Sequence, residues 1–386
     1  MQSFVFHNPT KIVFGANTAS QVGKNAARYG KKGLLVYGRD SIKRTGVHAQ
    51  VTTALNAAGV KVVEHGGVKS NPVLSHVQAG IELAKAEQVD VIIAVGGGSV
   101  LDESKAIAAG AMYSGDVWDF FCDKAQVQQA LPLVTVLTLA ATGSEMNSGG
   151  VVTNEATQQK FNIGSPHLFP KVSILDPTLT YSVPLDYTAY SAVDAISHLL
   201  EGYFTSADTA TALQDRFVEG LVQTIIESTE KILLKPDDAD ARATMMWAAT
   251  WALNGLSTAG IGVYSFPNHM IEHSLSALYD VAHGAGLAIV MPAWMAYSAE
   301  RQPAKFAQFA QRVFGCSAAD EQQLAQAGVA ALKQWFAKIG SPVTLAQANV
   351  PQSDIPAIAD NATMLAQKWG LHEYDAAVIS TILQRC

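Results

Sequence analysis

An apolar run from Val89 to Val95 leads directly into three glycines and then a helical segment, and this feature constrains the fold most. Similar short runs occur at Gly33–Tyr37, Val60–Glu64 and Leu131–Val136, with helical periodicity between them. Apolar runs of this length are typical of strands in a sheet that is covered on both faces. Their alternation with helices predicts a parallel, doubly wound α/β sheet of the Rossmann-like type.

The pattern changes in the second half of the chain. Strand signals fade after Asp176-Pro177, and from Pro184 onward the periodicity is helical, for example over Thr209–Leu234 and His269–Leu278. We therefore predict two domains, an α/β dinucleotide-binding domain over residues 1–180 and an all-helical domain for metal and substrate over residues 181–386. At the start of the chain, alternating apolar residues over positions 3–14 predict a short hairpin or paired strands.

The glycine-rich turn is Gly96-Gly97-Gly98-Ser99. A backbone free of side chains at a helix N-terminus can cradle phosphate oxygens. Ser99 as N-cap, with Asp102 three residues later, resembles a capping box. The turn is neither the usual dinucleotide fingerprint, because the sixth residue from Gly96 is Leu101, nor a P-loop; a glycine turn with only a geometric role is the alternative.

Two further loops are candidates for nucleotide contacts. Past the strand that ends at Tyr37 lies Gly38-Arg39-Asp40-Ser41, the position that often meets the adenosine ribose in such folds. The signal is mixed, but the basic residues favour a 2'-phosphate and hence NADP(H), with NAD(H) as the alternative. A second, hydroxyl-rich turn around Thr142 either meets another part of the nucleotide or is an ordinary loop.

Metal-binding side chains gather between residues 194 and 283. Asp194 and His198 are four residues apart, His269 and His273 repeat this spacing, and His283 follows. On a helix each pair shares one face, and the flanking residues are apolar, so these groups need partners. The alternative is a set of separately satisfied histidines. We predict one divalent metal ion held by an aspartate and three imidazoles.

The bulk composition limits the classes of function. The chain has 386 residues with a formal net charge of −7, and 15% of them are charged, so no electrostatic footprint for nucleic acid is present. Three scattered cysteines predict a reducing compartment rather than a disulfide framework. With neither a signal peptide nor a long apolar run, a cytoplasmic protein without a membrane partner is expected.

Motifs along nearly the whole chain resemble those of the iron-containing (group III) alcohol dehydrogenases, within them the branch of aldehyde reductases and butanol dehydrogenases. The series is more specific than any one of its members. It comprises Pro9–Gly15, Val36–Gly46, Gly96–Asp102, Thr138–Glu145, Leu175–Pro177, Asp194–His198 with Glu201, and His269, His273 and His283-Gly284. One departure is Phe266-Pro267-Asn268 before His269, where the family prefers small residues.

The resemblance implies roles for particular residues. It assigns the metal, Fe(II) or Zn(II), to Asp194, His198, His269 and His283, and makes His273 a neighbour that could relay a proton or orient the site. It places the pyrophosphate at Gly97, Gly98 and Ser99, the nicotinamide end near Thr138 and Thr142, and the adenosine ribose near residues 38–41. Family members that use NAD tend to carry Asp where this chain has Arg39, which favours NADP. A homodimer is expected.

The implied activity is the interconversion of aldehydes and primary alcohols by hydride transfer, over short or medium aliphatic and aromatic substrates. An NAD-dependent alcohol or diol dehydrogenase on the same fold is the nearest alternative. Two others are more remote. His269 to His273 matches H-x-x-E-H, a motif of one group of zinc peptidases. A lyase of the dehydroquinate synthase kind would need several basic residues near the metal ligands, and the sequence has few there.

Overall fold

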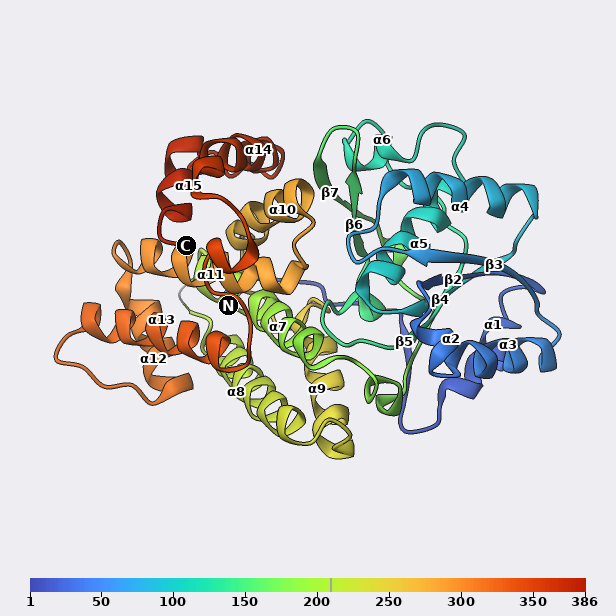
Figure 1. The fold of residues 1–386 in the computed structure, drawn as a ribbon, viewed down its shortest axis with the longest axis horizontal. Helices are drawn as coiled ribbons and strands as arrows, with labels where there is room; N and C mark the ends of the chain where they lie inside the picture. The colour runs from blue at the N-terminus through green and yellow to red at the C-terminus, as the bar shows by residue number, and fades with distance from the viewer. Residues whose placement is uncertain (209) are drawn as a thin grey trace. The chain divides into compact units, whose positions relative to one another are not determined.

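The structure is a computed structural model that describes residues 1–208 and 210–386 (Figure 1). The chain forms two compact units. What we call the α/β unit consists of His7–Val183 and Asp237–Asn254. The helical unit consists of Met1–Phe6, Pro184–Pro236 and Gly255–Cys386. The chain therefore passes from one unit to the other near the predicted boundary at residue 180 and also at three further points.

A six-stranded sheet forms the centre of the α/β unit. All of its strand pairs are parallel, in the order β1-β8-β5-β4-β2-β3, which confirms the predicted doubly wound class. The strands are β1 (Lys11–Phe14), β2 (Lys32–Gly38), β3 (Lys61–Val68), β4 (Val91–Gly96), β5 (Leu133–Leu137) and β8 (Val172–Leu175). Every residue of β4 and β5 is buried, as expected for central strands covered on both faces.

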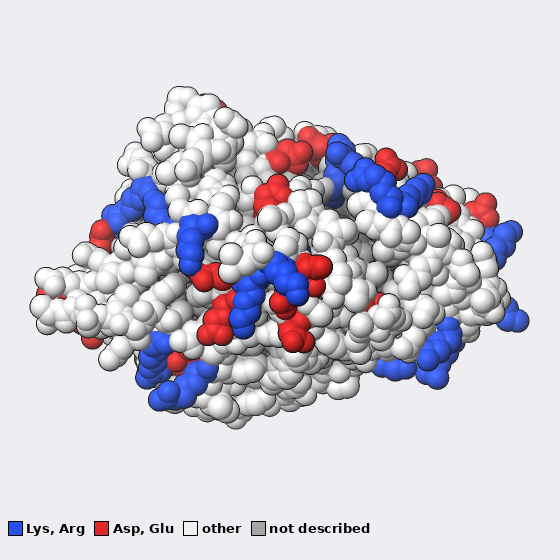
Figure 2. Space-filling model, turned by 60° about the horizontal axis from the view of Figure 1, so that its bottom comes forward, with Lys and Arg blue, Asp and Glu red and all other residues white. Residues whose placement is uncertain are grey.

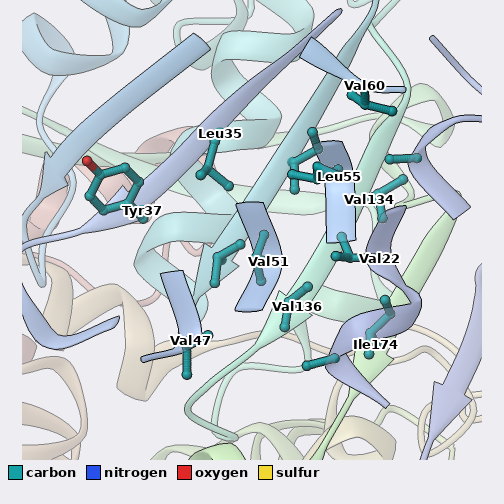
Figure 3. Packing of buried hydrophobic residues seen from close by; sticks show 14 of the residues in the cluster. Val22, Leu35, Tyr37, Val47, Val51, Leu55, Val60, Val134, Val136 and Ile174 are labelled. Atoms are coloured by element: carbon teal, nitrogen blue, oxygen red, sulfur yellow. The ribbon is translucent and has the colours of Figure 1, made fainter. Parts of the chain in front are cut away.

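Helices α1 (Val22–Ala26) and α3 (Val47–Ala57) cover one face of this sheet. Their apolar side chains meet those of the strands in a single core, in which Val51 and Leu55 pack near Leu35, Val134 and Val136 (Figure 3). Helices α4 (Leu74–Ala86) and α5 (Gly98–Ala111) pack against each other and cover the opposite face. The short helices α2 (Ser41–Arg44) and α6 (Trp118–Phe121) and the later α9 (Ala239–Ala252) complete the unit.

Two details of the first half differ from the sequence prediction. The predicted hairpin over residues 3–14 is wrong, because only Lys11–Phe14 forms a strand and it pairs in parallel with β8. The alternation reflects one edge strand rather than two paired ones. A hairpin that the periodicity did not reveal joins β6 (Gly149–Asn154) to β7 (Gln159–Gly164), with Gln158 at a φ of 52° in the turn.

The helical unit contains α7 (Leu185–Thr205), α8 (Ala212–Leu234), α10 (Pro267–Tyr279), α11 (His283–Ala299), α12 (Pro303–Phe314), α13 (Glu321–Lys338), α14 (Ile355–Lys368) and α15 (Ala376–Leu383). This confirms the predicted helical second half, although the expected start of one helix at Thr209 lies outside the described residues. Helix α7 is buried on all sides over Ser191–Tyr203 and packs against α8, α10 and α11. Polar side chains on this helix therefore need partners inside the unit.

On the face shown in Figure 2, basic and acidic side chains are interspersed rather than gathered by sign. Among the described residues, every helix is too short or too polar to cross a membrane.

Candidate metal and nucleotide sites

Three helices of the helical unit bring the predicted metal ligands together. Helix α7 carries Asp194 and His198 one turn apart, α10 carries His269, and His283 is the first residue of α11. The family departure before His269 is accommodated, since Pro267 occupies the first position of α10, where proline is favoured and no backbone N–H is needed. The four side chains that the sequence predicts as ligands, which come from distant segments, therefore lie in one cluster.

The spacing of the donor atoms suits one ion. Asp194 Oδ1 lies 3.7 Å from His198 Nε2, 3.9 Å from His269 Nε2 and 3.6 Å from His283 Nε2. These distances are too long for hydrogen bonds. Two ligands on a tetrahedral ion with bonds of about 2.0–2.2 Å lie about 3.3–3.6 Å apart, so a small inward movement would close the set.

Burial adds a second reason to expect a cation. Within residues 1–208 and 210–386, Asp194 Oδ1 and His269 Nε2 are buried and have no hydrogen-bond partner. Leaving buried polar atoms unsatisfied costs about 1–3 kcal/mol each. A divalent ion would satisfy both atoms at once, and an aspartate with imidazoles is a donor set that suits Fe(II) or Zn(II).

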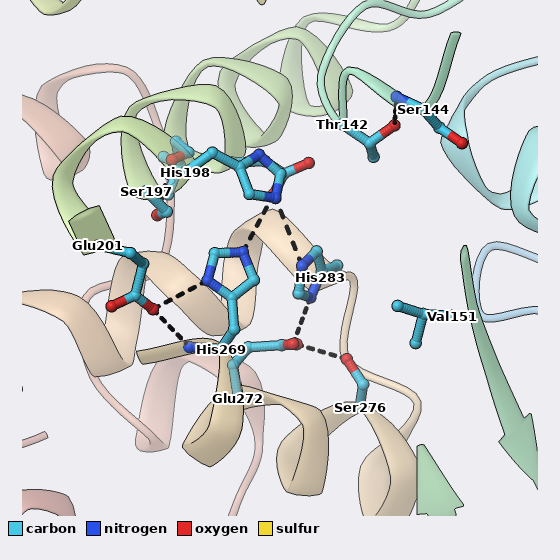
Figure 4. A network of polar contacts seen from close by, with 12 residues as sticks. Thr142, Ser144, Val151, Ser197, His198, Glu201, His269, Glu272, Ser276 and His283 are labelled. Carbon is cyan, nitrogen blue, oxygen red and sulfur yellow. Dashed lines mark hydrogen bonds and ion pairs between the residues drawn. The ribbon is translucent and has the colours of Figure 1, made fainter. Parts of the chain in front are cut away.

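Two glutamates orient the imidazoles from behind (Figure 4). Glu201 Oε1, on α7, lies 3.0 Å from His269 Nδ1 and also accepts the backbone N–H of His269 at 2.9 Å. Glu272 Oε2, on α10, contacts His283 Nδ1, while its other oxygen accepts a hydrogen bond from Ser276. Carboxylates in this position fix the ring so that Nε2 points toward the ion.

The pKa shifts of these groups fit a candidate metal site. Burial raises the pKa of Asp194, but the surrounding imidazoles of His198, His269 and His283 outweigh it and bring the pKa down to about 2. Burial lowers the pKa of His198 to about 4. Burial also lowers the pKa of His269, yet its two carboxylate neighbours raise it to about 9. Asp194 is thus ionised and His198 neutral, the forms that donate electron pairs, while His269 must lose its proton to an entering ion.

His273 lies beside this cluster. It is buried on α10, and its ring centroid is 6.4 Å from that of His269, 5.7 Å from that of His283 and 5.7 Å from that of Trp369. Glu272, His273 and His283 also offer donor atoms that lie within 4.8 Å of one another. The carboxylate of Glu272 contacts His283 Nδ1 and Ser276 Oγ. These contacts suit a group that orients His283 better than the general base of a peptidase.

The glycine-rich turn joins β4 to α5 in the α/β unit. Helix α5 begins at Gly98 with Gly97 as its N-cap, so no side chain caps its first turn. The predicted capping box of Ser99 with Asp102 is wrong, because Ser99 lies inside the helix and its hydroxyl donates to the carbonyl of Ser70. A first turn without a side-chain cap is the kind of helix start at which backbone N–H groups bind phosphate.

Asp102 has a different role from the predicted one. Its Oδ1 accepts a hydrogen bond from Ser144 Oγ at 2.6 Å, and its Oδ2 accepts one from the backbone of Val151 at 3.0 Å. It therefore ties α5 to the loop that follows β5 and to β6. Thr142, in that loop, accepts a hydrogen bond from Ser144 N at 3.2 Å, and Thr138 follows β5 with its N–H bonded to Gly96 O at 3.0 Å. The glycine turn and the threonine loop are thus neighbours in one structure.

The predicted ribose loop lies at the end of β2. Gly38 is the last residue of the strand, where the register with β3 shifts, and Arg39, Asp40 and Ser41 are exposed. Lys43, three residues after Asp40, places its ammonium 5.1 Å from the centroid of the Tyr37 ring. Lys43 therefore lies over the end of β2, while Arg39, the first residue after the strand, is exposed.

Three of these residues have contacts in the site regions that were not predicted from the sequence. Glu201 is three residues after His198 on α7, and Glu272 is three residues after His269 on α10, so each shares a face with a ligand. That spacing was a usable signal. The third is Lys105, a fully buried lysine in an alanine-rich helix, which donates to Ser144 Oγ at 2.8 Å, Asn147 Oδ1 at 2.9 Å and Gly149 O at 2.6 Å.

A parallel sheet with a glycine-rich turn, together with a buried cluster of one aspartate and three histidines, is characteristic of metal-dependent dehydrogenases that use a dinucleotide. Comparison with known families agrees. The family model described as iron-containing alcohol dehydrogenase matches residues 9–177. The model of the C-terminal part of the Fe-containing alcohol dehydrogenase family matches residues 188–384. The chain belongs to the iron-containing alcohol dehydrogenase family, which confirms the predicted enzyme class, an oxidoreductase that interconverts alcohols and aldehydes.

Individual relatives match over nearly their full length. The chain is 44% identical to the probable NADH-dependent butanol dehydrogenase 1 of Bacillus subtilis, over 94% of each chain. It is 37% identical to the NADPH-dependent aldehyde reductase YqhD of Escherichia coli, over 93% of this chain and 92% of that protein. The crystal structure of NADH-dependent butanol dehydrogenase A from Thermotoga maritima superposes with a TM-score of 0.94 at 46% identity, covering 100% of this chain and 98% of that one.

Proposed function

We propose that this protein interconverts aldehydes and primary alcohols with NADP(H), using one divalent metal ion. The main observation in support is that Asp194 Oδ1 lies within 4 Å of the Nε2 atoms of His198, His269 and His283. Relatives named as a butanol dehydrogenase and as an aldehyde reductase support small aliphatic aldehydes as substrates, and we propose aromatic aldehydes in addition. The apolar residues of the helical unit agree with such substrates.

The four clustered side chains would hold Fe(II) or Zn(II). When bound, such an ion supplies a Lewis acid that polarises a carbonyl oxygen, and the dinucleotide supplies the hydride. The protein's own contribution is to hold its imidazoles in place. Glu201 fixes the His269 ring and Glu272 fixes the His283 ring, so neither has to reorient as charge develops on the substrate.

The dinucleotide would bind to the α/β unit. Gly97, Gly98 and Ser99 are assigned to its pyrophosphate, Thr138 and Thr142 to its nicotinamide end, and residues 38–41 to its adenosine ribose. The supporting observation is the start of α5 at Gly98 without a side-chain cap. In this arrangement the backbone N–H groups of the first turn bind phosphate oxygens.

Preference for NADP(H) rests on Arg39, an exposed side chain at the tip of β2. A guanidinium at this position can bind a 2'-phosphate through two parallel hydrogen bonds. Asp40 beside it would accept a hydrogen bond from a free 2'-hydroxyl, so an NAD-dependent enzyme is the alternative. Relatives of both kinds occur, since some are named NADH-dependent and one is named NADPH-dependent.

His273 is our candidate for the group that returns a proton to the product. It is buried next to the ligands, and its ring lies 5.7 Å from that of His283, within reach of a relay through one water molecule. The competing role is to orient the cluster through a hydrogen bond. A variant separates the two roles, because His273→Gln would keep a hydrogen-bonding group but could not carry a proton at neutral pH.

The test is an assay of purified protein with its bound metal quantified. A panel of aldehydes is supplied with NADPH and, separately, with NADH. We expect kcat/KM to be higher with NADPH, and Arg39→Asp to reverse the order. Equal or faster rates with NADH would contradict the assignment of Arg39, and no reduction of any aldehyde would contradict the proposed function itself.

Metal retention tests the ligand set in parallel. Asp194→Ala should lose the ion, whereas His273→Ala should keep it. The opposite result would favour a peptidase-type site at His269 and His273. A homodimer and a cytoplasmic location complete the proposal, and the molar mass of the native protein in solution tests the first of these.

A further inference from the structure

A second group of metal-type donors lies in the α/β unit, separate from the Asp194 cluster. It consists of His65 on β3, His76 on α4 and Glu103 on α5. One donor atom from each residue lies within 4.8 Å of the other two. Glu103 is fully buried, His65 is 9% exposed, and the His76 side chain is 27% exposed, so the group is enclosed but reachable from one side.

The geometry converges on the carboxylate. Glu103 Oε1 lies 2.6 Å from His76 Nδ1 and 3.4 Å from His65 Nε2. The two imidazole rings are stacked, with centroids 4.2 Å apart and an interplanar angle of 29°. One strand and two helices, β3, α4 and α5, therefore present two ring nitrogens and a carboxylate oxygen to one point.

Hydrogen bonds between these groups leave two of their buried atoms unsatisfied. Glu103 Oε2 and His65 Nε2 have no hydrogen-bond partner in the part of the chain that the structure describes. A carboxylate oxygen that is fully buried without a partner destabilises the folded state. The space beside His65 depends on Gly80, because a Cβ atom at that position would lie 2.9 Å from His65 Nε2.

We propose that His65, His76 and Glu103 form a second binding site for a divalent transition-metal ion, of the class represented by Zn(II). Two imidazoles and one carboxylate select such ions over Mg(II) and Ca(II), which prefer oxygen ligands. Water would complete the coordination on the exposed side of His76. None of these three residues belongs to the cluster assigned to the catalytic metal.

Entry of an ion needs only a small adjustment. Donors that share a tetrahedral ion at about 2.0–2.2 Å lie about 3.3–3.6 Å apart, a spacing that the His65–Glu103 distance of 3.4 Å already has. The His76–Glu103 contact of 2.6 Å must open by about 0.7–1 Å, and the ion takes the place of the proton between them. His76 is the most exposed of the three, so it can make this movement.

The bound ion would act as a cross-link. It would join β3 and α4 to α5, the helix that begins at the glycine-rich turn. Because an ion that binds only the folded state stabilises it by mass action, Zn(II) should raise the unfolding temperature through this site.

The first experiment measures ion stoichiometry by equilibrium dialysis of the full chain against micromolar Zn(II), followed by elemental analysis. Wild type should retain two ions per chain, His76→Ala one, His283→Ala one, and the double variant none. His48→Ala is the matched control on α3 and should retain two. The same ion content in His76→Ala as in wild type would overturn the proposal.

A second measurement guards against a misfolded variant. In the His283→Ala background, Zn(II) should raise the midpoint of thermal unfolding by several degrees, and Glu103→Gln should abolish the rise while leaving the circular dichroism spectrum unchanged. If Zn(II) raised the unfolding midpoint of the Glu103→Gln variant by the same amount, the proposal of a second site would be wrong. Failure of the catalytic proposal would look different, because His76→Ala would then still lose an ion while His283→Ala lost none.

Discussion

Glu201 Oε1 lies 3.0 Å from His269 Nδ1 and accepts the backbone N–H of the same residue at 2.9 Å, so a single carboxylate oxygen fixes both the ring and the start of α10. Its second oxygen accepts a hydrogen bond from Asn268 Nδ2 at 3.0 Å. The carboxylate is fully buried, and no movement of α10 relative to α7 is needed for His269 to direct Nε2 at the ion.

Replacement of Glu201 by Gln should weaken metal binding about 10- to 100-fold, because a neutral amide holds the His269 ring less firmly and lowers the basicity of the imidazole. Competition with a chromophoric chelator measures the Kd. Glu300→Gln, at an exposed ion pair with Arg385, is the control and should leave the Kd unchanged. An unaltered Kd for Glu201→Gln would show that the contact is not needed for binding.

Gly98→Ala should disturb the start of α5. A Cβ atom there would lie 2.3 Å from Thr142 Cγ2 and 2.5 Å from Thr142 Oγ1. Alanine favours a helix by about 1 kcal/mol over glycine, but forcing this contact apart costs about 1–3 kcal/mol, so steric conflict should win. We expect lower stability to urea and weaker NADPH binding, measured by fluorescence titration. Gly164→Ala, where a Cβ meets nothing within 4 Å, should change neither.

Gly220→Ala should increase stability, in contrast to Gly98→Ala. Gly220 lies on the exposed side of α8, and a Cβ atom there meets nothing within 4 Å. Since alanine has the higher helix propensity and no contact opposes it, the free energy of unfolding should rise by about 1 kcal/mol. Urea denaturation monitored by circular dichroism checks this, and a destabilised variant would contradict the open space at this position.

Lys105 should make stability depend on pH in the alkaline range. Burial lowers the pKa of this lysine to about 8, although Asp102 and Glu145 act in the raising direction. Between about pH 8 and the ordinary value of 10.5, the unfolded chain binds a proton that the native protein does not, so stability should rise with pH. The slope approaches about 1.4 kcal/mol per pH unit at most.

Lys105→Met removes this contribution, so its free energy of unfolding should lose the rise between pH 8 and 10 that the wild type shows. Lys24→Met, on the exposed face of α1, serves as the control and should follow the wild type. Parallel curves for Lys105→Met and the wild type would mean that Lys105 remains charged in the native protein.

The sequence was sufficient for the parallel sheet because Val91–Gly96 and Leu133–Leu137 are short apolar runs that fit only strands covered on both faces. It was also sufficient to bring Asp194 and His198 together, because a helical period of 3.6 places them on one face. In both cases the decisive information is local, and the structure adds only the partner surface.

Other features depend on residues far apart in the chain. Glu201 meets His269 across 68 positions, and Lys105 meets Gly149 across 44, so no periodicity reports either contact. The predicted N-cap of α5 was wrong for a related reason. The Ser99 hydroxyl donates to the carbonyl of Ser70, 29 residues earlier, rather than accepting from its own helix. Tertiary partners decided these cases over local preference.

Helix α9 belongs to the α/β unit although it follows two helices of the helical unit in sequence. Its Thr250 Oγ1 donates to Glu145 Oε1 at 2.6 Å, and Glu145, in the segment between β5 and β6, is fully buried. A fragment cut at residue 180 would therefore keep the sheet but lose the hydroxyl that satisfies this carboxyl. Recombination of this enzyme with its relatives should therefore respect four crossover points rather than one, because the α/β unit takes residues from both halves of the gene.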